Sequence, residues 1–132
     1  MPAAVSSKQP RKQRRGRYNA KPHNRRKLIS SHLCGDSGND LIKQYNCRAI
    51  PVIKGDIVRI VRGDKDIVGK EALVTEIFTR NLTIGLEGIN VKKADGSEIT
   101  RKIAPSNVII TKLNLSDPKR KEKLDRLKEG YK

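Results

Sequence analysis

Aromatic residues are scarce in this sequence, which has three Tyr, one Phe and no Trp. Proteins that bind single strands on an aromatic platform stack successive bases on such rings, so the composition counts against that class. Long apolar runs are also missing, since no segment has the length of a signal-peptide core or a transmembrane helix. We therefore expect a cytosolic or nuclear protein. An anionic membrane surface is the weaker alternative as a partner, and because there is neither a broad amphipathic face nor a lipid-anchor motif, we expect no membrane binding.

Cysteine and histidine are equally rare. Cys34 and Cys47 are too few for a disulfide framework, and a reducing compartment would keep them as thiols. Together with His23 and His32 they are the only conventional soft metal ligands, and their spacing matches no compact zinc pattern. We therefore predict no metal site and no cofactor.

Catalytic patterns are missing as well. The sequence has no phosphate-cradling glycine loop followed by Lys and Ser or Thr, and no convincing set of nucleophile, base and orienting group. The neighbouring acids Asp64 and Asp66 stand in a segment rich in Lys and Arg, which is typical of a turn rather than of acid-base catalysis. The sequence predicts a protein that is not an enzyme.

Positive charge is what the chain has in excess. It carries 30 Lys and Arg against 14 Asp and Glu, a formal net charge of +16. A field of this strength attracts polyanions, and nucleic acid is the partner that it favours. The charge is uneven: residues 1–50 contain 12 basic and 2 acidic residues, 51–111 contain 10 and 8, and 112–132 contain 8 and 4.

The apolar residues gather in the nearly neutral centre of the chain. Val58 and Ile60 lie two positions apart, segment 73–78 is rich in apolar residues, and Leu82, Ile84 and Leu86 alternate with less apolar residues. These patterns predict consecutive half-buried strands. A further strand at 108–110 would close the sheet, and about five short strands favour a small, strongly bent closed barrel over residues 49–112. The predicted fold class is mainly β.

Turn residues divide these strands. Residues 79–81 are a plausible tight hairpin loop, and Glu87-Gly88 indicates a bulge. Asp95-Gly96 predicts a two-residue hairpin, because both positions tolerate positive φ.

Residues 1–48 form a predicted basic extension. Its first 27 residues have almost nothing apolar, and their positive charges repel one another when the segment is alone. On a nucleic acid, each phosphate that these charges neutralise would add affinity. A plain solvated tail is the alternative, but Arg predominates and polar and aromatic side chains are interleaved. Short helices are expected over 25–33 and 40–45, and 49–52 is expected to be extended because a proline follows Ile50.

Residues 113–132 form a predicted basic helix at the other end. Asp117 suits the cap, Pro118 the first position and Gly130 the stop. Its apolar stripe is only Leu124 and Leu127, so we expect burial alone not to stabilise it and a phosphate surface to order it.

Several motifs carry a resemblance to a known family. The stretch from Gly55-Asp56 to Glu76-Ile77 resembles the KOW motif, a strand, a glycine-containing loop and a second strand. Segments 8–14, 18–20, 25–27 and 31–33 resemble the N-terminal extension of one ribosomal family, and 62–64, 87–88, 93–96, 105–108 and 117–120 resemble its body. This is the universal large-subunit ribosomal protein family numbered twenty-four, in its archaeal form, whose eukaryotic counterpart is numbered twenty-six.

The sequence departs from the family pattern in three places. The loop Lys65 to Gly69 is longer than usual, Ala72 replaces an expected glycine, and there are extra residues between Leu33 and Tyr45 that include 35–39.

The resemblance implies an SH3-like KOW barrel that binds large-subunit ribosomal RNA in its 5′ domain. It also implies an early role in assembly, a place near the peptide exit tunnel of the cytoplasmic ribosome, neighbouring ribosomal proteins as partners, and no homo-oligomer. The alternative is a KOW-type transcription elongation factor that binds RNA polymerase, but no further partner-binding domain fits in this chain. The predicted RNA-binding residues are Arg11, Lys12, Arg14, Arg15, Arg17, Tyr18, Asn19, Lys21, His23, Arg25, Arg26, Lys27, Lys54, Arg59, Arg62, Lys65 and Lys70.

Overall fold

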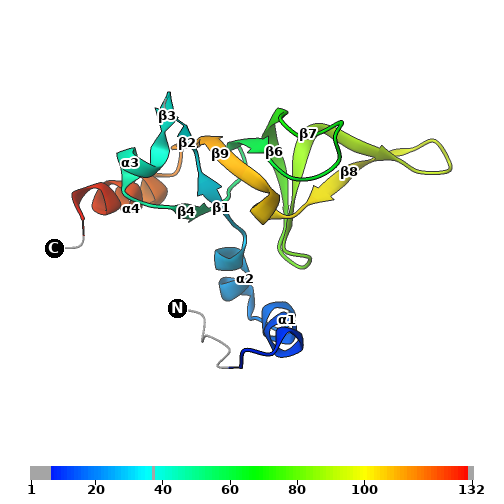
Figure 1. Cartoon of the computed structure of the whole chain (residues 1–132), viewed down its shortest axis with the longest axis horizontal. Coiled ribbons are helices and arrows are strands. Elements are labelled where there is room, and N and C mark those ends of the chain that lie inside the picture. The colour runs from blue at the N-terminus through cyan, green and yellow to red at the C-terminus, as the bar shows by residue number, and fades with distance from the viewer. Residues whose placement is uncertain (1–6, 37, 131–132) are drawn as a thin grey trace.

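The computed structural model of the chain describes residues 7–36 and 38–130, and shows a bent sheet with helices at its margins (Figure 1). The helices are α1 (Pro10–Tyr18), α2 (Pro22–Leu28), α3 (Leu41–Tyr45), α4 (Pro118–Glu129) and the 3-10 turn η1 (Pro105–Asn107). The strands are β1 (Ser30–Leu33), β2 (Gly35–Asp36), β3 (Asn39–Asp40), β4 (Ala49–Pro51), β5 (Ile57–Ile60), β6 (Glu71–Phe78), β7 (Thr83–Lys92), β8 (Glu98–Ile103) and β9 (Val108–Lys112).

Seven strands form the main sheet in the order β4-β1-β9-β5-β6-β7-β8. All neighbours are antiparallel except β1 and β9, which run parallel. The fold is mainly β and resembles a small barrel, but the expectation of a closed barrel is wrong, because β4 and β8 remain as edges. The insertion of β1 between β4 and β9 extends one end of the sheet instead of closing it.

The central strands follow the predicted alternation. Val58 and Ile60 on β5 and Ile84 and Leu86 on β7 have at most 1% of their surface exposed. Leu82, just before β7, is also buried. Since side chains of a strand alternate between its faces, these residues share one core. The predicted strands at 73–78 and 108–110 are confirmed within β6 and β9.

The turns between these strands are confirmed in place and corrected in detail. β6 and β7 are joined at 79–82, and the β7–β8 register is irregular between Gly85 and Asn90, around the predicted bulge. At Asp95-Gly96 the amide of Lys93 donates to the carbonyl of Ser97 over 2.8 Å, so the loop has three residues rather than two. Only Gly96 takes the positive φ (87°), while the Asp95 carboxylate accepts from the Ser97 amide at 2.9 Å.

The helix expected over 25–33 is wrong in its second half. α2 ends at Leu28, and Ser30–Leu33 is strand β1. Ser31 and Leu33 are buried while His32 is exposed, which is the period of a strand. The Ser31 hydroxyl donates to the carbonyl of Pro105 over 2.7 Å. Pairing with β9, far along the chain, therefore outweighs the weak local preference for helix. The helix expected at 40–45 and the extended segment after it are confirmed as α3 and β4.

The C-terminal helix α4 has the predicted ends, since the Asp117 carboxylate accepts from the Lys119 amide and Gly130 stands at the C-cap. The helix buries Arg120 as well as one residue of its narrow apolar stripe, and its ordering by a phosphate surface stays a prediction. Leu124 is 1% exposed and belongs to the core, and α4 packs against α3. Figure 1 shows the two helices side by side at one end of the molecule.

A buried ion pair fixes α4 to the turn before β5. Arg120 Nη1 and Nη2 donate to Asp56 Oδ1 and Oδ2 at 2.6 and 2.8 Å, and Asp56 is fully buried. The amides of Ile53 and Asn114 donate to the same carboxylate. Both charges are thus paired and further hydrogen-bonded, which is the condition under which a buried pair is tolerated. Gly55 (φ 88°) leaves room for the Asn114 side chain, since a Cβ there would lie 2.4 Å from the side-chain nitrogen Nδ2, which donates to the Lys54 carbonyl.

Candidate nucleic-acid interface

The first helix of the extension, α1, presents cations to solvent on all sides. None of its nine residues is buried, and its first turn holds no acid. Four like-charged pairs stand three or four positions apart, Arg11–Arg14, Arg11–Arg15, Lys12–Arg15 and Arg14–Arg17. Such pairs destabilise a helix by about 0.2–0.5 kcal/mol each. A polar helix with this repulsion is matched by an anionic partner rather than by a protein core.

A corner at residues 19–21 joins α1 to α2. Arg25 Nε donates to the carbonyl of Ala20 over 2.9 Å, and its Nη2 donates to the carbonyl of Tyr18. Pro22 begins α2 without losing a hydrogen bond, because the first amides of a helix have no intrahelical acceptor. The Arg25 guanidinium thus fixes the shape of the basic arm, residues 7–28. This role sets Arg25 apart from the other predicted contact residues.

The second helix is the part of the arm that touches the sheet. Ile29, at its C-cap, is 1% exposed, and its carbonyl accepts from the amide of Val52 over 3.0 Å. An apolar cleft of about 260 Å³ lies there, with Arg26 among its lining residues. His23, Arg26 and Lys27 are exposed, so this docked helix holds them at the molecular surface.

The predicted residues of the KOW segment lie on β5 and the turns around it. Lys54 is exposed in the turn before β5, and Arg62, Lys65 and Lys70 are exposed in the loop that follows. That loop is closed where the Gly69 amide donates to the Ile60 carbonyl over 2.8 Å. The longer loop noted in the sequence therefore remains an ordered turn on the sheet.

Two arginines beside this loop are already paired. Arg59 Nη2 lies 2.5 Å from Asp36 Oδ2, and Arg101 Nη2 lies 2.5 Å from Asp64 Oδ2. The hydrogen bond from Arg59 holds the pKa of the Asp36 carboxyl below its ordinary value and raises the pKa of the guanidinium. Arg59 is therefore less free to take a phosphate than Arg62, whose side chain has no hydrogen bond or ion pair within residues 7–36 and 38–130.

The structure adds exposed cations that sequence reasoning did not select. Lys119, Lys121 and Lys123 are exposed on α4, and Lys92 and Lys93 are exposed on the β7–β8 hairpin. The basic composition of these two segments is the sequence feature that could have identified these lysines. The sequence marks Leu124 as apolar, but it does not indicate that α4 is also docked through Arg120 and so holds its lysines in place.

Other kinds of site find no support in the described residues. Across 7–36 and 38–130, no three His, Cys, Asp or Glu residues come together as a metal site would require. No helix in the same ranges is long and apolar enough to cross a bilayer.

Comparison with known proteins identifies the family. The sequence profile of the ribosomal proteins numbered twenty-six in eukaryotes and twenty-four in archaea matches residues 7–127. The chain belongs to this family. It is therefore a ribosomal protein, and its location is the cytoplasmic ribosome.

Curated relatives agree with this assignment. The large ribosomal subunit protein uL24 of Methanospirillum hungatei is 48% identical over 120 residues, which cover 91% of this chain and 95% of the relative. The uL24 proteins of Methanoculleus marisnigri and Sulfurisphaera tokodaii are 44% and 42% identical, over 91% and 94% of this chain and 94% and 88% of their own lengths. The family match thus includes the arm, the sheet and most of α4.

Proposed function

We propose that the protein is a structural, non-catalytic component of the large ribosomal subunit that binds large-subunit ribosomal RNA. The observation that carries the proposal is the family match over residues 7–127, which includes an arm whose cations are almost all exposed. Phosphate neutralisation supplies most of the affinity, because each cation that meets a phosphate releases a counterion. The sheet supplies the shape that places the arm.

The basic arm and the sheet differ in charge, and this difference indicates what each contributes to RNA binding. Residues 8–27 contain ten Lys and Arg, whereas segment 51–111 is nearly neutral. The proposed contact residues of the arm are Arg11, Lys12, Arg14, Arg15, Arg17, Tyr18, Asn19, Lys21, His23, Arg26 and Lys27. The β5 segment adds Lys54, Arg62, Lys65 and Lys70, while Arg25 and Arg59 contribute more to the protein's own structure through their carbonyl and Asp36 contacts.

We further propose binding within the 5′ domain of that RNA, early in subunit assembly and near the peptide exit tunnel. Neighbouring ribosomal proteins complete the surroundings, and the protein acts as a single copy. Chemical footprinting of the bound RNA tests the first point, since protection is expected to concentrate in the 5′ domain. Protection confined to other domains would contradict it.

Co-sedimentation tests the main proposal. The full chain is mixed with archaeal large ribosomal subunits depleted of their own copy, and separately with RNA polymerase. It is expected to sediment with the large subunit and to withstand moderate salt, while its affinity for free ribosomal RNA falls steeply as salt rises. Recovery with polymerase alone would overturn the proposal.

A further inference from the structure

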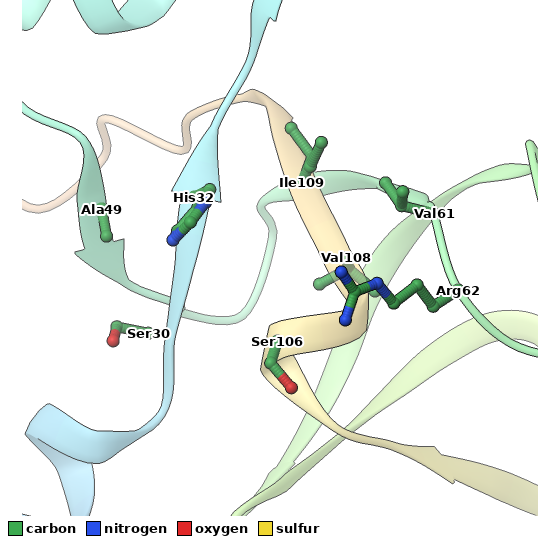
Figure 2. Close-up of a pocket in the computed structure, with 8 residues that line it drawn as sticks. All are labelled: Ser30, His32, Ala49, Val61, Arg62, Ser106, Val108 and Ile109. Atoms are coloured by element: carbon green, nitrogen blue, oxygen red, sulfur yellow. The ribbon is translucent and has the colours of Figure 1, made fainter.

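A hollow of about 450 Å³ lies on the open face of strands β4, β1, β9 and the end of β5. Figure 2 shows His32 and Ser30 on β1 at one side, with Arg62 and Ser106 at the other, and Val61 and Ile109 also line the hollow. Four of these six residues are exposed, so the lining is open to solvent. The volume of the hollow falls within the range of pockets that bind small organic ligands, about 300–1,000 Å³.

The sheet register explains why these side chains meet. His32 is paired with Ile109 of β9 on one side and with Ala49 of β4 on the other. The alternate residues Ser31, Leu33 and Ile110 point into the core. The polar residues of β1 and the apolar Ile109 of β9 are thus brought onto one outer face by the parallel pairing that the sequence did not predict.

The hollow carries an unneutralised cation. The guanidinium of Arg62 points across it in Figure 2 and has no hydrogen bond or ion pair in the described residues. The nearby carboxylates Asp36 and Asp64 are occupied by Arg59 and Arg101. An anion that enters therefore meets a planar donor fork that is free to bind it.

The remaining groups match the other parts of a nucleotide. The flat imidazole of His32 and the apolar Ile109 and Val61 offer surfaces against which an unstacked base can lie. The Ser30 and Ser106 hydroxyls can donate to or accept from sugar and phosphate oxygens. A peptide strand would instead use the backbone edge of β4, so this face with its free guanidinium favours RNA.

We propose that this hollow binds one nucleotide splayed out of a single-stranded part of the ribosomal RNA. Its base packs on His32, and a phosphate next to it binds Arg62 and Ser106. This inference rests on the proposed function, because it names a particular contact within the RNA-binding surface. His32, Ser30 and Ser106 are contact residues that the charge pattern of the sequence did not select.

The two main residues leave different signatures in salt titrations. Full-length His32→Ala, His32→Phe and Arg62→Gln proteins are measured against a transcript of archaeal large-subunit ribosomal RNA. Arg62→Gln is expected to reduce the slope of log K against log salt by about 0.7–0.9, one phosphate contact. His32→Ala is expected to weaken binding about 5- to 150-fold with an unchanged slope, the effect of a lost stacked base. His32→Phe is expected to retain most of the affinity.

A mutant cycle shows whether both residues hold the same nucleotide. His32→Ala and Arg62→Gln together are expected to cost less than the product of their separate effects, because the first loss releases the nucleotide. The matched control combines His32→Ala with Lys121→Gln on the remote helix α4, and its effects are expected to multiply. Equal melting temperatures exclude misfolding, since His32, Arg62 and Lys121 are all exposed.

Photocrosslinking supplies the deciding outcome. RNA substituted with 4-thiouridine is expected to crosslink within residues 30–33 or 106–109 at one position of the transcript. Wild-type affinity and slope in both single variants, or a His32→Phe protein as weak as His32→Ala, would overturn the inference while leaving the proposed function intact. Failure of the wild-type chain to bind the RNA would overturn both.

Discussion

Asp56 is the residue on which the attachment of α4 depends. It lies at the turn before β5 and receives two bonds from Arg120, which is 64 positions away in the chain, as well as two backbone amides. The core of the sheet and the basic C-terminal helix therefore share one carboxylate. Because nothing in local sequence marks such a distant pair, the sequence indicates this residue only as part of a Gly-Asp turn.

Asp56→Ala is expected to lower the free energy of unfolding by about 3–5 kcal/mol, since it leaves the buried Arg120 guanidinium without its counter-ion. Urea denaturation measures the loss. The control is Glu122→Ala, which removes the exposed pair with Arg126 and is expected to cost at most about 0.5 kcal/mol. A cost below about 1 kcal/mol for Asp56→Ala would show that the buried pair does not hold the helix.

Asp36 is the carboxylate whose protonation should respond to Arg59. The hydrogen bond from Arg59 lowers the pKa of Asp36 in the folded protein. Its stabilising effect is therefore complete above the unfolded-state pKa of about 3.9, and is lost as pH falls through the lower folded-state pKa. Arg59→Gln is expected to destabilise the protein at neutral pH but not in strong acid.

Nuclear magnetic resonance titration of the Asp36 carboxyl measures this directly. In Arg59→Gln the midpoint is expected to rise towards the ordinary aspartate value. Asp95 provides an internal control, because its lowered pKa comes from hydrogen bonds with Ser97 and should not move. An Asp36 midpoint that stays in place would mean that the pair in the structure is not formed in solution.

Among the elements, strands with strong alternation and helices with clear caps were predictable. Ile84 and Leu86 display period two in the sequence, and Asp117, Pro118 and Gly130 mark both ends of α4. Strand β1 was not predictable, because Ser-Ser-His-Leu has little β propensity and its position is decided by pairing with β9. The basic arm was predictable as an interface, but the hollow around His32 was not, since it arises only from that pairing.

In helix α1, repulsion between like-charged side chains opposes helix formation. Replacing Arg11, Arg14 and Arg15 with Gln removes all four of its like-charged pairs, while Gln has a helix propensity close to that of Arg. Without RNA, the triple variant is expected to have more helix at 10–18 than the wild type, and with RNA it is expected to bind more weakly. Backbone chemical shifts measure the first effect and RNA titration the second.

The same experiment at high salt supplies the control. Screening should raise helix content at 10–18 in the wild type and leave the triple variant nearly unchanged, because only the wild type has the repulsion to screen. If the triple variant has no more helix than the wild type at low salt, charge repulsion is not what limits this element.

At the scale of the molecule, residue 28 divides the chain into two parts. The residues before it supply positive charge for RNA binding, and the residues after it form the core that stabilises the fold. Residues before it include ten Lys and Arg and, among the described positions, none that is buried. Immediately after it come Ile29 and Leu33, with 1% and 2% of their surface exposed, and the strand that lies between β4 and β9. Two truncations should therefore behave very differently although they differ by only a few residues.

Removal of residues 1–27 is expected to leave the melting temperature near that of the intact protein and to reduce the salt slope of RNA binding by several units, since each lost phosphate contact contributes about 0.7–0.9. Removal of residues 1–33 is expected to abolish cooperative melting, because it deletes β1 and two core side chains. A chain with Lys119, Lys121 and Lys123 changed to Gln controls for loss of charge elsewhere and should lose less of the slope. If the shorter truncation bound RNA with unaltered affinity and slope, the arm would not be the principal binding element, and the sheet together with α4 would have to supply the contacts.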